Sequence, residues 1–386
     1  MDNIVAALEH NDRVREIELF DLTNSQLEDI TNSAAMQKPF LELTHLDIVM
    51  RKFEDDKPRP ILPYSFLGGT APRLRWLRLE CVPFPGLPKL LLSATHLVDL
   101  NLSDIPRSGY IPPEAMATSL SALTSLESLF LRFRCPRPRS ALESRRPPPP
   151  PLARSILPSL TDIRFRGASE SLEEILARVD VPRLNEMYIT FFNQIIFDTP
   201  QLFRFISRRP TLRAPKEGGI VFGSNNITVK FPSQTSDNGV LSVKIQCTPS
   251  EWQLSSLEQV CISSSPLLST LENLYIFEDP WDSPRWQDDF ENTLWLDLLR
   301  SFVAVKNLYI SEEFVPRVAP ALQELVGGRT TEVLPALDNI FLEGFQPWGP
   351  HHKGIEKFFA ARWLSNHKVA VFLWDTYSRL NKHWGF

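Results

Sequence analysis

Large aliphatic residues recur along this chain in a fixed pattern of three positions. The pattern L-x-x-L-x-L starts at Leu74 and again 23 residues later at Leu97. Between the two copies lie a turn-rich segment, 82–88, and an apolar run, 89–94, which is long enough for about two helical turns. A short strand, a turn and a helical or irregular return limb make one leucine-rich repeat. The two copies therefore predict two successive repeats of this kind.

The pattern continues over most of the chain. Within its two uninterrupted runs, successive copies start 23 to 34 residues apart, which scatters around the length of leucine-rich repeats with some units lengthened by loops. With any large aliphatic residue allowed, the copies start at Val14, Leu43, Leu74, Leu97, Leu126, Leu160, Leu184, Leu271, Val305 and Leu337. A further match at Leu257 lies only 14 residues before Leu271, too few for a turn and a return limb. We expect a helix over 251–263 instead, with Trp252, Leu257, Val260 and Cys261 facing inward.

Return limbs with helical spacing follow the later strands. Apolar residues recur there at intervals of three and four, as on the buried face of an amphipathic helix. The first such segment contains Phe290, Leu294, Trp295, Leu298, Leu299 and Phe302; the second contains Val318, Leu322, Leu325 and Val326, with Gly327-Gly328 as a stop; the third contains Ile355, Phe358, Phe359, Arg362 and Trp363. A strand-like run, 369–374, follows the third helix, and we expect 351–386 to cap the end of the array.

Two stretches interrupt the repeats. In 190–250, apolar residues alternate on both sides of the turn signal Asp237-Asn238-Gly239, which predicts either two irregular repeats or a β-hairpin. The second stretch, 134–158, is a Pro/Arg-rich loop insertion whose five consecutive prolines favour an extended polyproline II path. Its residues Arg145, Pro148 and Pro151 also fit an R-x-x-P-x-x-P ligand of SH3-type domains, although such runs are common wherever a repeat tolerates a longer loop.

These elements predict an α/β fold, a single leucine-rich-repeat solenoid over 1–386. It would be a curved horseshoe with an inner parallel β-sheet, outer helices and roughly 11 to 13 coils. Leu77, Leu100, Leu129 and Ile163 should then lie one above another in the sheet. The Asn or Cys that usually follows the strand of such a repeat is absent, so we expect irregular repeats with uneven turns. The residues in its place are Val82, Ile105, Arg134 and Ala168.

Composition narrows the class of protein. The formal net charge of −5 gives no global attraction to nucleic acid or to an anionic membrane. The four cysteines lie far apart without a C-x-x-C pair, which predicts neither a disulfide framework nor a zinc site. No apolar run approaches the about 18 residues that span a bilayer, and the N-terminus is too acidic for a secretory signal. We therefore expect an intracellular protein, in the cytoplasm or the nucleus.

The sequence contains no recognisable catalytic motif. A phosphate-binding G-x-x-x-x-G-K-[ST] is missing, and the Gly218-Gly219 region lacks the lysine. Neither H-E-x-x-H nor G-x-S-x-G occurs. His351-His352, the only histidine pair, has no Cys or further His beside it, so we expect no metal site. We expect a protein that is not an enzyme and needs no cofactor, although a triad assembled in space would leave no motif.

The residues between the aliphatic positions define a surface. Because side chains alternate along a strand, the residue between the last two aliphatic positions should point away from the core, onto the concave face of a solenoid. In chain order this middle residue is Glu18, Asp47, Arg78, Asn101, Phe130, Arg164, Tyr188, Tyr275, Tyr309 and Phe341. The position two residues earlier adds Trp76 and Asp99, and the position two residues later adds Arg132, Arg166 and Phe277.

This surface has two interpretations. Exposed aromatic and arginine side chains dominate interface energetics, so the surface predicts a partner-binding strip. Its residues are Trp76, Arg78, Phe130, Arg132, Arg164, Arg166, Tyr188, Tyr275, Tyr309 and Phe341. The alternative is that these side chains pack side by side and cover the backbone of a parallel sheet. Under the first interpretation, an arginine group would favour an acidic or phosphorylated partner: Arg78, Arg132, Arg134, Arg164 and Arg166.

Three stretches of the chain resemble a known family. They are IVAALEHNDRVREIELFDLTNSQLEDI (4–30), EWQLSSLEQVCISSSPLLSTLENLYIFED (251–279) and GIEKFFAARWLSNHKVAVFLW (354–374). Through them the chain resembles the leucine-rich-repeat region of F-box-like proteins of mushroom-forming (basidiomycete) fungi. In that family an N-terminal F-box docks on the Skp-type adaptor of a cullin ubiquitin ligase, and the repeats are regarded as the substrate-holding part. No L-P-x-E-[IL]-L-like segment precedes the first repeat, so we expect the F-box module itself to be absent and a Skp-type adaptor to bind only if an F-box is supplied elsewhere.

Together these observations predict a non-catalytic protein-interaction module, the substrate-recognition part of an F-box-type ubiquitin ligase. A leucine-rich-repeat scaffold or sensor without a ligase link is the alternative. An enzyme embedded in the repeats is a third possibility. The expected partner is a protein, and neither nucleic acid nor a membrane is expected.

Overall fold

The computed structural model describes most of the chain. The described residues are 2–51, 59–134, 154–194, 197–232, 239–247, 251–263, 265–282, 292–325, 331–343 and 352–374. They fall into two compact units, Met1–Glu186 and Met187–Phe386. Both units combine mostly parallel strands with helices, the α/β architecture that the sequence predicts.

Six strands form the sheet of the first unit. They follow one another in the order β1-β2-β3-β4-β5-β7, and each pairs in parallel with the next. Their bounds are β1 Glu16–Leu22, β2 His45–Met50, β3 Trp76–Glu80, β4 Asp99–Ile105, β5 Ser128–Phe133 and β7 Asp162–Gly167. Each strand coincides with one copy of the L-x-x-L-x-L pattern, so the prediction of these strands is confirmed.

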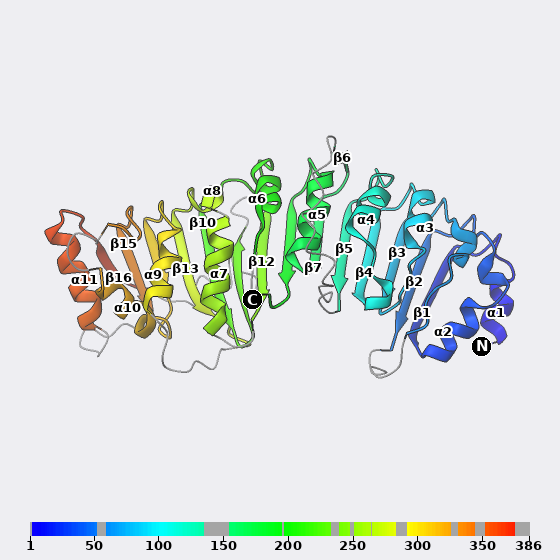
Figure 1. Ribbon diagram of the computed structural model, residues 1–386, viewed down its shortest axis with the longest axis horizontal. Helices are drawn as coiled ribbons and strands as arrows, with labels where there is room; N and C mark the ends of the chain where they lie inside the picture. The colour runs from blue at the N-terminus through cyan, green and yellow to red at the C-terminus, as the bar shows by residue number, and fades with distance from the viewer. Residues whose placement is uncertain are drawn as a thin grey trace, which may run out of the picture. The chain divides into compact units, whose positions relative to one another are not determined.

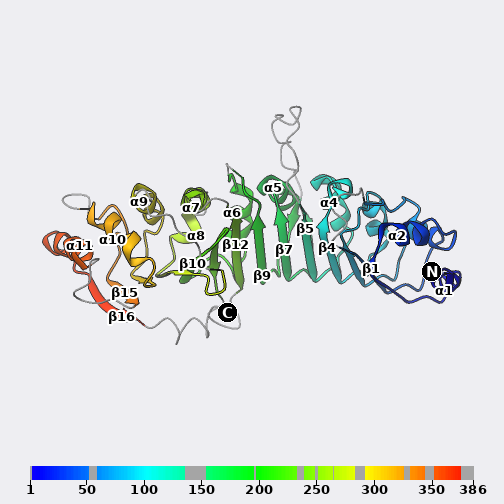
Figure 2. The same ribbon diagram turned by 90° about the horizontal axis from the view of Figure 1, so that it is seen from below.

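Short helices form the return limbs of the first unit (Figure 1). They are α1 Asp2–Leu8, α2 Asn24–Thr31, α3 Leu87–Ser93, α4 Pro113–Leu120 and α5 Ser169–Arg178, with the 3-10 helices η1 Ala35–Gln37, η2 Phe66–Gly69 and η3 Arg107–Gly109. A small parallel pair, β6 Ser155–Ile156 and β8 Val179–Asp180, stands apart from the main strands. Figure 2 shows α4 and α5 on one side of β4, β5 and β7. We call the other side of these strands the helix-free face.

Aliphatic side chains on the helix-covered side form the core of the first unit. Leu77 pairs in register with Leu100, Leu100 with Leu129, and Leu129 with Ile163. All four side chains are buried. Burying one large aliphatic side chain stabilises a fold by about 1.5–3 kcal/mol, so the repetition of this row holds successive repeats together. The predicted row is confirmed.

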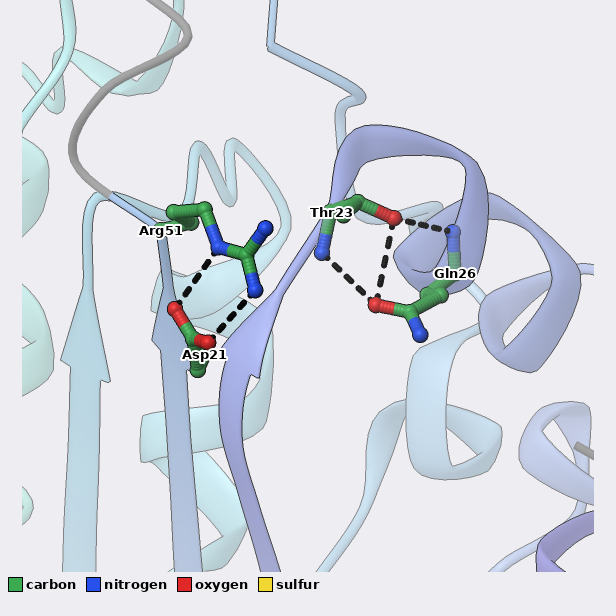
Figure 3. Close-up of polar contacts among 4 residues, drawn as sticks. All are labelled: Asp21, Thr23, Gln26 and Arg51. Atoms are coloured by element: carbon green, nitrogen blue, oxygen red, sulfur yellow. Dashed lines mark hydrogen bonds and ion pairs between the residues drawn. The ribbon is translucent and has the colours of Figure 1, made fainter.

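A bidentate ion pair and a capping box fix the turn from β1 into α2 (Figure 3). Asp21 has a φ of 55°, and its carboxylate accepts hydrogen bonds from Arg51 Nε at 2.9 Å and Arg51 Nη2 at 2.6 Å. The hydrogen bond from Arg51 lowers the pKa of Asp21. Gln26 N–H donates to Thr23 Oγ1, and Thr23 N–H donates to Gln26 Oε1. Because Arg51 follows β2, the ion pair joins the ends of two neighbouring strands.

Irregular turns recur after other strands of the first unit. Cys81 and Asp104 have φ values of 60° and 49°, in the left-handed region. The register between β4 and β5 shifts between Leu102 and Ile105, and that between β1 and β2 shifts before Leu22. An extra residue at such a point bends the strand end as a bulge does. These turns agree with the uneven repeats expected from the missing Asn or Cys.

The second unit contains eight strands among its described residues, in the order β9-β12-β11-β10-β13-β14-β15-β16. Their bounds are β9 Glu186–Phe191, β10 Glu217–Gly223, β11 Asn226–Phe231, β12 Val240–Gln246, β13 Asn273–Glu278, β14 Asn307–Ile310, β15 Asn339–Glu343 and β16 Ala370–Trp374. From β10 through β13, β14 and β15 to β16, each strand pairs in parallel with the next. The predicted strands at Leu184, Leu271, Val305, Leu337 and 369–374 are confirmed.

The stretch 190–250 contains a β-hairpin, one of its two predicted forms. β11 pairs antiparallel with β12, with Val229 opposite Val243. Of the predicted turn between them, only Gly239 lies within the described residues. The strand β10 was not predicted; it pairs antiparallel with β11 on one side and parallel with β13 on the other. Its two adjacent glycines, Gly218 and Gly219, give it weak strand propensity, and its pairing partners compensate for this.

Six helices complete the described part of the second unit. They are α6 Pro200–Ser207, α7 Glu251–Ser263, α8 Ser265–Leu268, α9 Asn292–Arg300, α10 Val315–Gln323 and α11 His352–Leu364. The predicted helix 251–263 is confirmed as α7, with Leu257, Val260 and Cys261 buried. Trp252 is 43% exposed, so its predicted inward position is wrong. Figure 2 shows α7 on one side of β10 and β12.

The last described elements, α11 and β16, leave large apolar side chains exposed. Trp363 and Leu364 at the end of α11 are exposed, as are Phe372 and Leu373 of β16. The capping role expected for 351–386 stays a prediction, because 375–386 lie outside the described residues. The same holds for Gly327-Gly328 and for the Pro/Arg-rich insertion, of which 135–153, including Arg145, Pro148 and Pro151, are not described. That one solenoid runs through both units also stays a prediction.

Candidate interaction surface

The helix-free face of the first unit carries side chains in two regular rows. The strand register aligns the first residues of the six strands, and we call them the first-position row: Glu16, His45, Trp76, Asp99, Ser128 and Asp162. Two residues further along each strand lies the middle row: Glu18, Asp47, Arg78, Asn101, Phe130 and Arg164. Alternation along each strand separates both rows from the leucine core. The sequence prediction of which residues share this face is confirmed for the first unit.

The arginines of this face lie close to carboxylates. Arg78 Nη2 donates to Glu80 Oε2 at 2.7 Å, and Arg78 Nη1 lies 3.5 Å from Asp47 Oδ2. The predicted arginine group therefore does not present a block of unopposed positive charge. Two more of its members have carboxylate neighbours at hydrogen-bond distance: Arg132 Nε lies 2.9 Å from Asp104 Oδ1, and Arg164 Nε donates to Asp162 Oδ2 at 3.1 Å.

Arg166 differs from these residues because it lies beside another arginine. It pairs in register with Arg132 across β5 and β7. Burial lowers the pKa of Arg166, the neighbouring Arg132 lowers it further, and Asp104 opposes both effects. Arg134, the first residue of the insertion, is exposed. The acidic or phosphorylated partner expected for this group stays a prediction, and the ion pairs within the face reduce the positive charge available for it.

Carboxylates of the same face are partly desolvated. Burial raises the pKa of Asp99, against a hydrogen bond from Ser128. Burial also raises the pKa of Asp162, with Arg164 opposing and Glu186 reinforcing the shift. The pKa of Asp47 is raised by burial too, although Arg78 and His45 oppose it. The first unit therefore contains several carboxyl groups whose ionised form is disfavoured by burial.

An aromatic pair sits within this charged face. The rings of His45 and Trp76 are parallel, with an interplanar angle of 9° and centroids 5.7 Å apart. His45 Nε2 lies 3.5 Å from Glu18 Oε1. Trp76 is 39% exposed, which is high for a large aromatic residue in the middle of a sheet. Phe130 in the middle row is half-buried, as is Tyr188 of the second unit.

The corresponding face of the second unit is a packed aromatic row. Tyr275 stacks on Tyr309, and Tyr309 on Phe341, each with centroids 4.3 Å apart and rings within 11° of parallel. Phe341 stacks on Phe372 at 5.1 Å, and the ring of Trp374 lies 5.4 Å from that of Tyr309. Tyr275 and Tyr309 are only 6% and 7% exposed. The expectation that these two rings lie open to a partner is therefore wrong, because they pack against one another as the alternative interpretation predicted.

A ladder of amide side chains runs beside this aromatic row, and sequence reasoning missed it. Asn307 Nδ2 donates to Asn273 Oδ1, and Asn339 Nδ2 donates to Asn307 Oδ1, each at 2.7 Å. Asn273 Nδ2 lies 3.5 Å from Glu217 Oε1. The signal was the phrase Asn-[Leu/Ile]-[Tyr/Phe]-[Ile/Leu], present three times at 273, 307 and 339. The asparagine of a leucine-rich repeat usually follows the strand, whereas this ladder lies at the first residue of each strand.

Other chemistry is scarce in the described parts of the chain. The cysteines described, Cys81, Cys247 and Cys261, are buried, and burial raises the pKa of Cys247 to about 11. No group of three or more His, Cys, Asp or Glu that could hold a metal ion occurs among the residues described. His351 lies outside them. No described helix has the length and apolar character needed to cross a membrane.

Comparisons with known proteins find similarity among solved structures, but none among protein-family models or curated proteins. No protein-family model matches the chain, and no curated protein matches it. Among solved structures, the chain is similar to the leucine-rich repeat-containing protein LegL7 from Legionella pneumophila, at 12% sequence identity. The match covers 89% of this chain and 96% of that one, with a TM-score of 0.32. A likeness this distant carries no argument about function, which has to come from the surface itself.

Proposed function

We propose that the chain is a non-enzymatic, protein-binding repeat protein that holds its partner on the helix-free face of the first unit. One observation carries the proposal: this face keeps an exposed aromatic ring and charges of both signs open to solvent across six consecutive strands. Trp76, Asn101 and Arg164 all remain accessible there. Aromatic and arginine side chains are the types that dominate interface energetics, and repeat arrays use such extended surfaces for binding.

Site-specific photocrosslinking tests this proposal. A benzophenone side chain placed at Asn101 reports on the helix-free face, and one placed at Leu92, exposed on α3, reports on the opposite side. In an extract of the source cells, we expect the Asn101 probe to give adducts of discrete mass that excess unlabelled protein competes away. Excess Trp76→Ala protein should compete less well. Equal labelling from Leu92, or adducts that no competitor reduces, would contradict the proposal.

We propose further that this binding serves an F-box-type ubiquitin ligase, as its substrate-recognition part. Support for this comes from the resemblance at 4–30, 251–279 and 354–374 alone. Tagging the gene product at its own locus and purifying it under mild conditions tests the idea. Recovery of a Skp-type adaptor together with a cullin is the expected result. Recovery of partners that crosslink at Asn101, without adaptor or cullin, would favour a scaffold or sensor instead.

A further inference from the structure

The position of Trp76 leaves one face of its indole ring open. Trp76 lies between His45 of β2 and Asp99 of β4 in the first-position row. The imidazole of His45 stacks on the β2 side of the ring, so the other face is turned toward Asp99 on β4. An exposed aromatic ring with a carboxylate on the next strand matches the recognition of a cation, which the ring attracts through its face and the acid pairs directly.

The charge of the first-position row favours a cation over an anion. Glu16, Asp99 and Asp162 are acidic, and His45 is the only basic residue type in the row. The guanidinium groups of the middle row are engaged by carboxylates: Arg164 donates to Asp162 and Arg78 to Glu80. Glu186 adds further negative charge near Asp162. An acidic or phosphorylated segment would meet repulsion here.

Asp47 supplies a second, independent sign of a ligand that donates hydrogen bonds. It is 6% exposed, yet its Oδ1 accepts no hydrogen bond from the residues that the structure describes. Its other oxygen, Oδ2, lies 3.5 Å from Arg78 Nη1, beyond the optimum for a hydrogen bond. Asp47 follows His45 by two residues on β2 and faces Arg78, two residues after Trp76 on β3. The unsatisfied acceptor therefore lies diagonally beside the Trp76 ring, and leaving such an acceptor unpaired is costly.

A guanidinium group fits these requirements better than an ammonium group. It is planar, so it stacks on an indole ring, and its N–H donors can pair in a bidentate way with a carboxylate beside that ring. We propose that Trp76 and Asp99 bind an arginine side chain from a basic, extended segment of the partner, and that Asp47 accepts a hydrogen bond from another donor of the same segment. This inference rests on the proposed function and specifies the chemistry of the partner. Asp99 pairs with the guanidinium edge and Trp76 covers its plane, whereas Asp47 lies on the β2 side of Trp76 and meets a neighbouring part of the segment.

Titration with short peptides tests the inference on the full chain. The probes are acetylated and amidated tri-arginine, tri-lysine and tri-glutamate, followed by calorimetry at low salt and by the indole N–H resonances. Of the nine tryptophans, Trp76 is assigned by its loss in Trp76→Phe. We expect tri-arginine to bind and to shift the Trp76 resonance. Tri-lysine should bind about fivefold to tenfold more weakly because it cannot stack in the same way, and tri-glutamate should not bind.

Matched variants locate the site. Trp76→Ala and Asp99→Asn should each weaken tri-arginine binding by about fivefold to tenfold, whereas Trp281→Ala, which removes a ring that is 85% exposed in the second unit, should leave it unchanged. Circular dichroism verifies that each variant is folded. Equal affinity for tri-lysine, tighter binding of tri-glutamate, or tri-arginine binding that survives Trp76→Ala would overturn the inference. If tri-arginine fails to bind while the Asn101 crosslinks persist, this inference falls and the proposed function stands.

Discussion

Strand β5 of the first unit and strand β13 of the second unit are built on the same sequence pattern. They differ in the exposure of the residues that lie between the aliphatic positions. In β5 buried residues alternate with half-buried ones from Ser128 to Arg132, whereas four consecutive residues of β13, Leu274 to Phe277, are buried. On β5 the outward residues are Phe130 and Arg132; on β13 they are Tyr275 and Phe277. The aliphatic positions therefore decide that a strand forms, and the residues between them decide whether its second face stays open.

Replacement of a stacked tyrosine should separate the two faces most strongly. Tyr309→Ala removes a buried ring that packs against three other rings, so we expect a loss of about 3–5 kcal/mol in the free energy of unfolding of the second unit. Phe130→Ala, at the equivalent middle position of the first unit, should cost clearly less because Phe130 is half-buried. Urea denaturation of both variants measures the difference. Equal losses would show that the two faces are packed alike.

Truncation of the core should erase the difference between the units. Leu100→Ala and Leu308→Ala each remove a fully buried aliphatic side chain from the helix-covered side, and each should cost about 2–5 kcal/mol. The two positions are equivalent in the repeat, so their losses should be similar. Denaturant unfolding followed by circular dichroism provides the comparison. A loss under about 1 kcal/mol, typical of surface positions, would contradict the assignment of that leucine to the core.

The asparagine ladder offers a contrast between polar networks. Asn307→Ala removes one donor and one acceptor of the ladder, so we expect a loss of about 1–3 kcal/mol. Asn101→Ala in the first unit removes only the acceptor for Ser103 Oγ, and should cost about 0.5–1.5 kcal/mol. Thermal unfolding of the two variants ranks them. A smaller loss for Asn307→Ala than for Asn101→Ala would mean that the ladder does not stabilise the second unit.

The desolvated acids of the first unit should give the smallest effect, visible as a dependence on pH. Because burial raises the pKa of Asp99, the folded state holds its proton more tightly than the unfolded state. Stability then falls as the pH rises through about 3.9, the usual value for aspartate, and through the raised value. Asp99→Asn can still accept the hydrogen bond from Ser128. The melting temperature of this variant minus that of the wild type should therefore be larger at pH 7 than at pH 3. A difference that shrinks as the pH rises would contradict this.

Much of the fold could be predicted from the sequence because its determinants are periodic and local. The ten L-x-x-L-x-L strands and helix α7 depend on spacing that a single chain displays. The predicted inward position of Trp252 was wrong because helical spacing shows which residues share one face of a helix, but not whether a neighbouring element covers each of them. Strand β10 was missed because its Gly218-Gly219 pair conceals a strand that depends on partners distant in the sequence.

The candidate surface could be predicted in its membership and only partly in its exposure. Alternation along a strand placed Arg78, Phe130 and Arg164 on one face, and the register confirmed it. Alternation gave no indication that Tyr275 and Tyr309 would be buried, since their burial comes from rings on β15 and β16. The ion pairs of Arg78 and Arg132 likewise depend on side-chain conformations across strands. The buried acceptor of Asp47 and the position of Asp99 beside Trp76 depend on burial and strand register, which the sequence alone does not show.

Hydroxyl-radical footprinting read out by mass spectrometry tests the central claim most directly, since it compares the two faces in one sample of unmodified protein. The account predicts rapid oxidation of Trp76 and strong protection of Tyr275 and Tyr309 relative to the unfolded chain. It also predicts that tri-arginine slows the oxidation of Trp76 and leaves the tyrosines unchanged. Rapid oxidation of the tyrosines together with protection of Trp76 would contradict the account.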